Sequence, residues 1–131
     1  YETIGYDLNF TVDFLKRKYP DKIWIVSDFD SSPNEVDLVI CADVIEHVIN
    51  PTNLLNFIKK MNPKHIVMST PDRDLLYEKL GRPYLGPPVN SHHIREWSYM
   101  EFKNYINHFF EILQHISIEK EYGQMIYCKL K

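Results

Sequence analysis

The sequence predicts an α/β domain in which helices cover both faces of a mostly parallel sheet. Short apolar runs alternate with segments of helical period, which is typical of this class. One run, residues 36–42, is almost continuously apolar, as in a strand covered on both faces. The last two strand-like runs, 110–118 and 124–130, are separated only by a turn, so we expect them to be antiparallel to each other.

The first half of the chain contains start signals for two helices. Asn9 is a candidate N-cap for a helix whose apolar face includes Phe10, Phe14 and Leu15. Pro51 suits the first position of the next helix. We expect strands at residues 4–6, 22–26 and 36–42, with a polar loop at 27–34.

The second half continues the alternation of strand and helix patterns. Residues 65–69 form an apolar run that predicts a further buried strand, and a short helix is expected at 72–80. The Gly- and Pro-rich stretch 81–90 has no period, so we interpret it as a loop or lid. Ser98 and Glu101 have the spacing of a capping box and predict the start of the last helix.

Composition limits the classes of partner. The 131 residues fit one domain, and the formal net charge is -3. No run of Lys and Arg exceeds three residues, so we expect neither a nucleic-acid surface nor a membrane surface. No stretch reaches the roughly 20 apolar residues of a transmembrane helix. Cys41 and Cys128 each lie inside an apolar run, which indicates core packing and a reducing, cytoplasmic compartment.

An acidic residue stands at the end of each of the first three predicted strands. These residues are Asp7, Asp28 and Asp43. Ligands of open parallel sheets bind outside the carboxyl ends of the strands, where a carboxylate can accept hydrogen bonds from ribose hydroxyls. Asp is also common where strands become turns, so each Asp alone has a structural alternative.

The residues after the third predicted strand carry a more specific pattern. Asp43-Val44-Ile45-Glu46-His47-Val48 follows the apolar run directly, and Asn50-Pro51 comes next. The stretch resembles the fourth-strand motif of class I S-adenosylmethionine (SAM)-dependent methyltransferases, most closely those acting on small molecules, sugars and quinones. The resemblance implies a Rossmann-like fold and SAM as the cofactor.

Neighbouring segments resemble the same family in order and spacing. Residues 3–8 resemble the second strand, 27–29 the end of the third strand, 67–71 the fifth strand and 93–98 the stretch before the last helix. The resemblance implies that Asp7 holds the ribose, that Asp28 bonds the adenine amine and that Phe29 lies against the base. The implied cofactor site comprises Asp7, Leu8, Asp28, Phe29, Ala42, Asp43 and His47.

One element of the family pattern is absent from these residues. The family's first strand is followed by a Gly-rich loop, whereas the four glycines here are Gly5, Gly81, Gly86 and Gly123. We therefore expect residues 1–131 to be the C-terminal portion of a methyltransferase domain, from the second strand onward. The sheet would then lack its first strand and the helix that follows it. Either a gap would remain in the sheet, or the remaining strands would pair in a different order. The alternative is a degenerate domain that no longer binds SAM.

Histidines after the Gly- and Pro-rich loop are the candidate catalytic groups. Methyl transfer to a hydroxyl requires removal of a proton, which histidine can accept at neutral pH. His92 and His93 are the primary candidates for the general base, and Asp72 and His47 are alternatives. No metal is assigned, although His92 and His93 with a nearby carboxylate form an alternative metal site.

Aromatic and basic residues around these histidines could contact an acceptor. Tyr84, Trp97 and Tyr99 suit either an acceptor wall or the core, and Arg82 and Arg95 suit either an acidic acceptor or surface ion pairs. The resulting prediction is SAM-dependent O-methylation of a sugar or other small hydroxyl-bearing acceptor, with surface glycans as one class. The alternatives are a non-catalytic scaffold that has lost SAM binding, and a nucleotide-dependent oxidoreductase, which the motif at 43–48 fits poorly.

Overall fold

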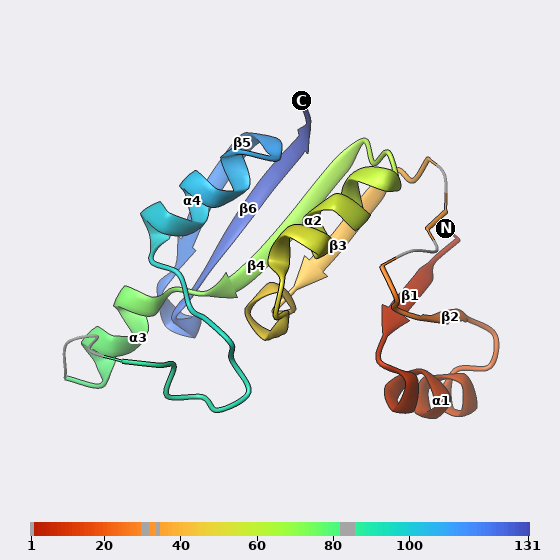
Figure 1. Ribbon diagram of the computed structural model, residues 1–131, viewed down its shortest axis with the longest axis horizontal. Coiled ribbons are helices and arrows are strands. Elements are labelled where there is room, and N and C mark those ends of the chain that lie inside the picture. Colours follow the sequence, from red (N-terminus) through yellow and green to blue (C-terminus); the bar gives the residue numbers. More distant parts are fainter. Residues whose placement is uncertain (1, 30–31, 34, 82–85) are drawn as a thin grey trace. The chain divides into compact units, whose positions relative to one another are not determined.

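The computed structural model describes residues 2–29, 32–33, 35–81 and 86–131 (Figure 1). The chain divides into two compact units, residues 1–32 and 33–131, and each is described by itself. Strands and helices alternate through both units, which confirms the predicted α/β class. No helix among the described residues is both long enough and apolar enough to span a membrane.

The first unit is a β-α-β motif with parallel strands. Strand β1 (Ile4–Asp7) is followed by helix α1 (Asn9–Lys18) and strand β2 (Ile23–Val26). The strands pair in register from Ile4 opposite Ile23 to Asp7 opposite Val26. The carboxyl ends of both strands therefore lie at the same edge of this small sheet.

Two predictions for helix α1 were wrong. Asn9 is the first helical residue, and Leu8 is the N-cap without a side-chain cap bond. The carbonyl of Leu8 already accepts the N–H of Val12 at 2.9 Å, so the helix begins one residue earlier than predicted. Its buried side is centred on Val12, whereas Phe10 and Phe14 of the predicted apolar face are 74% and 53% exposed.

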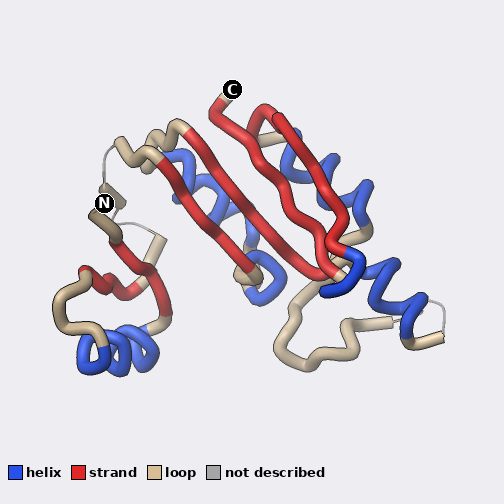
Figure 2. The backbone as a smooth tube through the Cα atoms, turned by 180° about the vertical axis from the view of Figure 1, so that it is seen from behind, coloured by secondary structure: helices blue, strands red, loops and turns tan. Residues whose placement is uncertain are grey.

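The second unit contains a four-stranded mixed sheet (Figure 2). Its strands are β3 (Leu38–Ala42), β4 (His65–Pro71), β5 (Phe110–Ile118) and β6 (Gly123–Leu130). Their order is β3-β4-β6-β5: β3 and β4 are parallel, and β6 runs antiparallel to both of its neighbours. The predicted antiparallel closing pair is confirmed. An irregularity between Ile112 and Gln114 interrupts the β5–β6 register.

Three α-helices and two 3-10 turns connect these strands. They are η1 (Ile45–His47), α2 (Pro51–Lys60), α3 (Arg73–Lys79), α4 (Tyr99–Asn107) and η2 (Glu119–Glu121). Pro51 is the first residue of α2, and Ser98 and Glu101 form the predicted capping box of α4. Helices α2 and α4 lie on the same face of the sheet, in front of it in Figure 1 and behind it in Figure 2.

The core of the second unit lies between this face and the two helices. Its largest fully buried side chains come from both layers, and burial of each contributes roughly 1.5–3 kcal/mol to folding. In β4 and β6 alternate residues are buried, as expected for strands with one face against helices. The helices contribute Leu55, Ile58, Phe102 and Ile106, and the strands contribute Ile66, Met68, Ile126 and Cys128.

The strand predicted to be covered on both faces has only one buried face. Cys41 is buried, but Leu38 and Ile40 are 48% and 69% exposed. Among the described strands β3 pairs only with β4, and β1 only with β2, so the strands form two sheets rather than one. Successive side chains of a strand point to opposite faces, and helices α2 and α4 lie on the same face of this sheet, so they leave Leu38 and Ile40 on the opposite face uncovered.

Candidate functional site

Predicted cofactor residues of the first unit lie at the carboxyl ends of its two strands. The Asp7 carboxylate accepts a hydrogen bond from the backbone N–H of Leu8 at 2.7 Å. The backbone carbonyl of Asp7 accepts the N–H of Ser27 at 2.9 Å, which ties the two strand ends together. Burial, followed by the negative charge of Asp28, raises the pKa of Tyr6.

Phe29, directly after Asp28, has a left-handed backbone with φ of 62°. A bulky residue rarely adopts this conformation, which is found preferentially where the surroundings impose it, as at binding sites. Asp43 in the second unit also has a positive φ, 51°. Three further described non-glycine residues share this feature, Glu35, Asn62 and Tyr122.

Asp43 is fixed at the end of β3 by the neighbouring strand. Its N–H donates to the carbonyl of Ser69 at 3.1 Å, and its carboxylate accepts the Ser69 hydroxyl at 3.1 Å. Ala42 pairs with Ser69 in the β3–β4 register. The predicted residues Ala42 and Asp43 are thus held against the carboxyl end of β4, at the sheet edge where ligands of α/β proteins bind.

A hollow of about 290 Å³ adjoins Asp43. Its lining combines carboxylates, hydroxyls and an amide from the end of β3, from β4, and from turn η2 with the start of β6. Sequence reasoning missed the contribution of that turn, because nothing in the local pattern of residues 119–124 shows which strand end it approaches. The polar lining residues are Asp43, Ser69, Thr70, Glu121 and Gln124.

Glu46, in turn η1, is a buried carboxylate that sequence analysis did not single out. It is 1% exposed, and one of its oxygens accepts the Thr70 hydroxyl at 3.0 Å. Burial raises the pKa of Glu46 above its usual range. Its backbone carbonyl accepts the N–H groups of Ile94 and Arg95 at 2.8 and 3.4 Å, so η1 holds the histidine-bearing loop.

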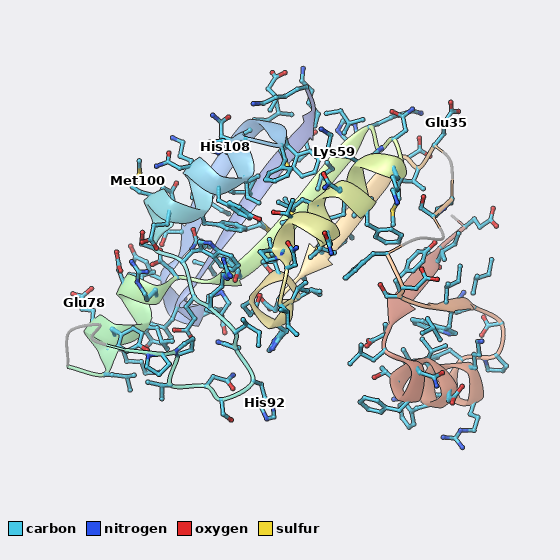
Figure 3. The ribbon with its side chains drawn as sticks, in the orientation of Figure 1. Glu35, Lys59, Glu78, His92, Met100 and His108 are labelled. Carbon is cyan, nitrogen blue, oxygen red and sulfur yellow. The ribbon has the colours of Figure 1, made fainter. Side chains whose placement is uncertain are left out.

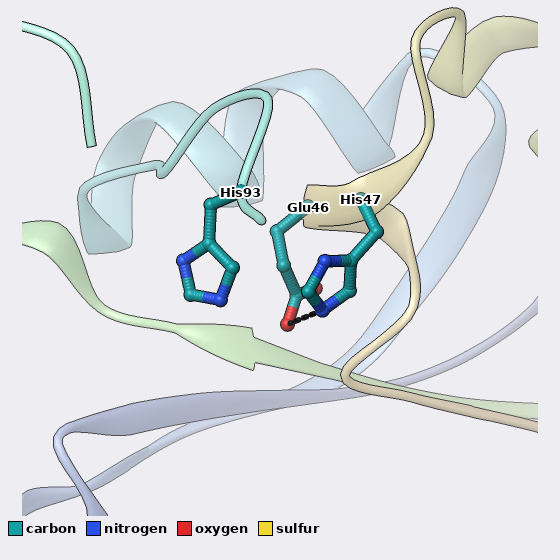
Figure 4. A group of neighbouring side chains, drawn as sticks. All are labelled: Glu46, His47 and His93. Atoms are coloured by element: carbon teal, nitrogen blue, oxygen red, sulfur yellow. Dashed lines mark ion pairs between the residues drawn. The ribbon is translucent and has the colours of Figure 1, made fainter. Parts of the chain in front are cut away.

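Two predicted histidines meet beside Glu46 (Figure 4). The rings of His47 and His93 are edge to face with centroids 4.9 Å apart. His47 Nε2 lies 3.8 Å from Glu46 Oε1, and His93 Nδ1 lies 2.6 Å from Oε1 of Glu96. Glu96, a second buried carboxylate, was also missed, although it belongs to the segment 93–98 used for the family resemblance.

The other two predicted catalytic residues lie in different surroundings. His92 is exposed, and its side chain points away from the body of this unit (Figure 3). Asp72 is 2% exposed and caps helix α3 by accepting the N–H of Asp74 at 3.0 Å. Burial raises the pKa of Asp72. The structure thus brings His47 and His93 together, but not His92 or Asp72 with them.

The candidate acceptor-wall aromatics pack within the second unit. Trp97 is buried and stacks on Tyr105 with centroids 6.1 Å apart, and the Arg95 guanidinium lies over it at 5.7 Å. The Tyr99 ring stacks on His115 at 3.6 Å. Tyr84 and Arg82 lie outside the described residues.

Comparison with known proteins identifies the family. Residues 1–120 match the family model described as "Methyltransferase domain". The chain belongs to this methyltransferase family. No curated protein matches this methyltransferase.

Solved structures with the same fold include methyltransferases with different acceptors. The PH0226 protein from Pyrococcus horikoshii OT3 has a TM-score of 0.74 and 15% identity, over 100% of this chain and 72% of that one. Magnesium protoporphyrin IX methyltransferase from Synechocystis PCC 6803 with bound SAH has a TM-score of 0.69 and 14% identity, over 99% of this chain and 64% of that one. The small RNA methyltransferase HEN1 has a TM-score of 0.62 and 17% identity, over 98% of this chain and 20% of that one.

This methyltransferase uses SAM as its methyl donor. The sulfonium of SAM supplies the electrophilic methyl group, so the protein has to bind the donor, align the acceptor and remove a proton where the acceptor is a hydroxyl. Identities of 14–17% to these neighbours establish the fold and leave the acceptor to be argued from the site itself.

Proposed function

We propose that this methyltransferase transfers the methyl group of SAM to a hydroxyl of a sugar or another small acceptor, with surface glycans as one candidate class. The observation that carries this proposal is the acid at the carboxyl end of β1, β2 and β3, each in the position that the family resemblance gives to a cofactor residue. Asp7 pairs with Val26 in the β1–β2 register, and the N–H of Asp43 donates to the carbonyl of Ser69. Asp28 comes two residues after the end of β2.

In the first unit, Asp7 would hold the ribose hydroxyls of SAM, with Leu8 beside them. A carboxylate offers about four lone-pair sites. The N–H of Leu8 uses one of those on Asp7 Oδ1, which orients the group and leaves acceptors for two hydroxyls. Asp28 would accept from the adenine amine. The left-handed backbone at Phe29 supports a special role for its ring against the base.

In the second unit, the family resemblance gives the role of cofactor residues to Ala42 and Asp43 at the end of β3. Asp43 lines the polar hollow, so its carboxylate is available to donors there as well as to the Ser69 hydroxyl. The composition of this hollow, rich in hydroxyl and carboxylate oxygens, suits a hydroxyl-bearing acceptor better than an apolar one.

The contacts of the two adjacent histidines favour His92 as the general base. Both ring nitrogens of His93 have partners, Glu96 and Asn90, whereas the ring of His92 makes no hydrogen bond to any described residue. An exposed imidazole can accept a proton and return it to water. His93→Ala would therefore act through structure, whereas His92→Ala would remove the base.

A small-molecule acceptor is favoured over RNA by charge. The net charge is -3 and the longest run of basic residues is three, whereas nucleic-acid recognition needs clustered cations. We also propose a cytoplasmic, reducing location, because Cys41 and Cys128 are free and buried. Burial raises the pKa of each thiol to about 12, so neither is suited to redox chemistry.

Calorimetry with SAM and a methyl-transfer assay with saccharide acceptors test the proposal on the intact protein. We expect Asp7→Asn to weaken SAM binding and His92→Ala to leave it unchanged while lowering turnover by roughly 100- to 10,000-fold. The exposed His108, whose ring contacts only the carbonyl of Asn104 in the described structure, provides the control substitution His108→Ala.

Three outcomes would contradict the proposal. Absence of SAM binding at millimolar cofactor would point to a non-catalytic scaffold. Unchanged turnover of His92→Ala would exclude His92 as the base. Methyl transfer to RNA oligonucleotides in the same assay, with none to saccharides, would show that the proposed acceptor class is wrong.

A further inference from the structure

We propose that Glu46, His47 and His93 form a binding site for one divalent transition-metal ion. One potential ligand atom from each residue lies within 4.8 Å of the others, and all three residues belong to the second unit (Figure 4). The proposal does not depend on the choice of acceptor or on His92 as the base. It rests on the hydrogen bonds that orient the three side chains.

The hydrogen bonds of His47 leave Nε2 free to bind a metal. His47 Nδ1 lies 2.8 Å from the backbone carbonyl of His92. A carbonyl can only accept, so Nδ1 carries the hydrogen, and the lone pair of the neutral ring is on Nε2. This is the nitrogen that faces Glu46 Oε1.

The lone pair of His93 is also on Nε2. The Asn90 side chain accepts the N–H of His92 through Oδ1 at 3.0 Å, which places its NH₂ group against His93 Nε2 at 2.9 Å. Because that NH₂ group donates, Nε2 is the acceptor, and Nδ1–H donates to Glu96 at 2.6 Å. A ring whose Nδ1–H is held by a carboxylate is the usual arrangement of a metal-binding histidine.

The carboxylates around the histidines add to the argument. Oε2 of Glu46 is used by Thr70, so Oε1, on the side of His47, is available as a ligand. Glu46 and Glu96 are 1% and 4% exposed, and each faces a histidine ring that is uncharged in the tautomers given above. Oε2 of Glu96 is buried without a hydrogen-bond partner among the described residues. A divalent cation would offset the charge of these two buried carboxylates.

The ligand set favours a first-row transition ion over Mg²⁺ or Ca²⁺. Two imidazoles and one carboxylate suit Zn²⁺, Co²⁺, Mn²⁺ or Fe²⁺, whereas Mg²⁺ and Ca²⁺ prefer oxygen ligands alone. Three protein ligands leave coordination positions open for water or an exogenous oxygen ligand.

Asn90 competes with the ion for His93. Its NH₂ group occupies the lone pair of Nε2 that a metal would need, so binding requires the amide to move away. Asn90 also accepts the N–H groups of His92 and, through its backbone carbonyl, of His93. Occupation of the site would therefore loosen the turn at 90–93. Asn90→Asp would keep the acceptor for His92 and replace the competing donor with a potential fourth ligand.

Titration of the intact, metal-free protein with Co²⁺ and Zn²⁺, followed by calorimetry and by the visible absorption of Co²⁺, tests the site. We expect one ion to bind per chain. We also expect the visible absorption of the bound Co²⁺ to be that of a site with nitrogen ligands. His47→Ala and His93→Ala should each weaken binding by at least 10-fold. Glu96→Gln should weaken it by about 10- to 100-fold, because Glu96 only positions His93. Asn90→Asp should tighten it by at least 10-fold.

Matched variants distinguish this site from the proposed catalytic function. His92→Ala changes the adjacent histidine, whose ring lies outside the cluster, and should bind Co²⁺ as the wild type does even if turnover is lost. His108→Ala should also leave Co²⁺ binding unchanged. Circular dichroism of each variant shows whether it is folded, and Asn90→Asp tests the site where His93→Ala does not fold. The proposal is overturned if no stoichiometric ion binds, if His47→Ala and His93→Ala bind as wild type, or if Asn90→Asp binds more weakly than wild type.

Discussion

Thr70 donates its hydroxyl to Oε2 of Glu46 at 3.0 Å, and both residues are buried. The bond joins strand β4 to turn η1, which in turn holds the loop that carries His92 and His93 through the backbone carbonyl of Glu46. Loss of this one donor would therefore affect both the folding of the unit and the placement of its histidines.

Thr70→Val tests the importance of that bond. Valine keeps the shape of the side chain but leaves a buried carboxyl oxygen without its donor, so we expect the free energy of unfolding to fall by about 1–3 kcal/mol. Urea denaturation measures the change. Thr70→Ser retains the hydroxyl and should lose less stability than Thr70→Val; a Val variant that loses no more than the Ser variant would contradict the importance of the hydrogen bond.

Asp72→Asn should change how stability depends on pH. Burial raises the pKa of Asp72 in the folded state, so the folded chain holds this proton more tightly than the unfolded chain. The resulting contribution is fully present below the unfolded pKa of about 3.9 and is lost as pH rises through the folded pKa. Asparagine cannot ionise and remains a good N-cap for α3. Asp72→Asn should thus gain stability relative to wild type between acidic and neutral pH.

Unfolding in urea at several pH values measures this effect. The exposed neighbour Asp74 provides the control Asp74→Asn, which lies in the same helical turn but is largely in solvent. Parallel pH profiles of wild type and Asp72→Asn would show that the buried carboxyl does not contribute.

Ser98→Ala should destabilise helix α4 by about 1 kcal/mol. The Ser98 side chain accepts the N–H of Glu101 at 3.2 Å, and the Glu101 carboxylate accepts the N–H of Ser98 at 2.9 Å. Ser98→Asp should retain most of the stability because it supplies an acceptor at the same position. Urea denaturation of both variants provides the measurement, and an Ala variant as stable as the Asp variant would contradict a capping role.

Gly5→Ala should weaken the pairing of β1 with β2. A Cβ on Gly5 would overlap the ring of Trp24, which is held in place by its Nε1–H bond to the Tyr19 carbonyl at 3.2 Å. We expect a loss of about 1–3 kcal/mol, because the ring must leave its position. Hydrogen exchange of the amides of β1 and β2 reports it. Gly86→Ala is the control, since its Cβ would meet no atom within 4 Å; the same exchange rates in both variants would argue against the clash.

Local signals in the sequence predicted most element boundaries. Pro51 and the Ser98–Glu101 pair start their helices where predicted, because capping depends on a few consecutive residues. The exposed faces were not predictable in this way. Phe10 and Phe14 have the spacing of a buried helix face, and residues 38–42 have the composition of a doubly covered strand, but burial depends on which elements lie against them.

The candidate site was predicted only in part for the same reason. Asp43, His47 and His93 stand in motifs that sequence comparison can recognise. Glu46 and Glu96 stand in the same motifs, but only the fold shows that their carboxylates are buried and paired with histidines. Asp72 satisfied the sequence criteria for a base, and its role as the cap of α3 became evident from its bond to Asp74.

Among the described strands, the edge of β3 away from β4 has no partner, which affects how a chain of these 131 residues has to be handled in solution. A strand with unpaired backbone groups and apolar side chains such as Leu38 and Ile40 is a template for β-sheet growth between molecules. Aggregation seeded at this edge would rise steeply with protein concentration and would compete with every binding measurement. Ile40→Lys is the substitution expected to suppress this aggregation with the smallest loss of core packing, because the Ile40 side chain is 69% exposed.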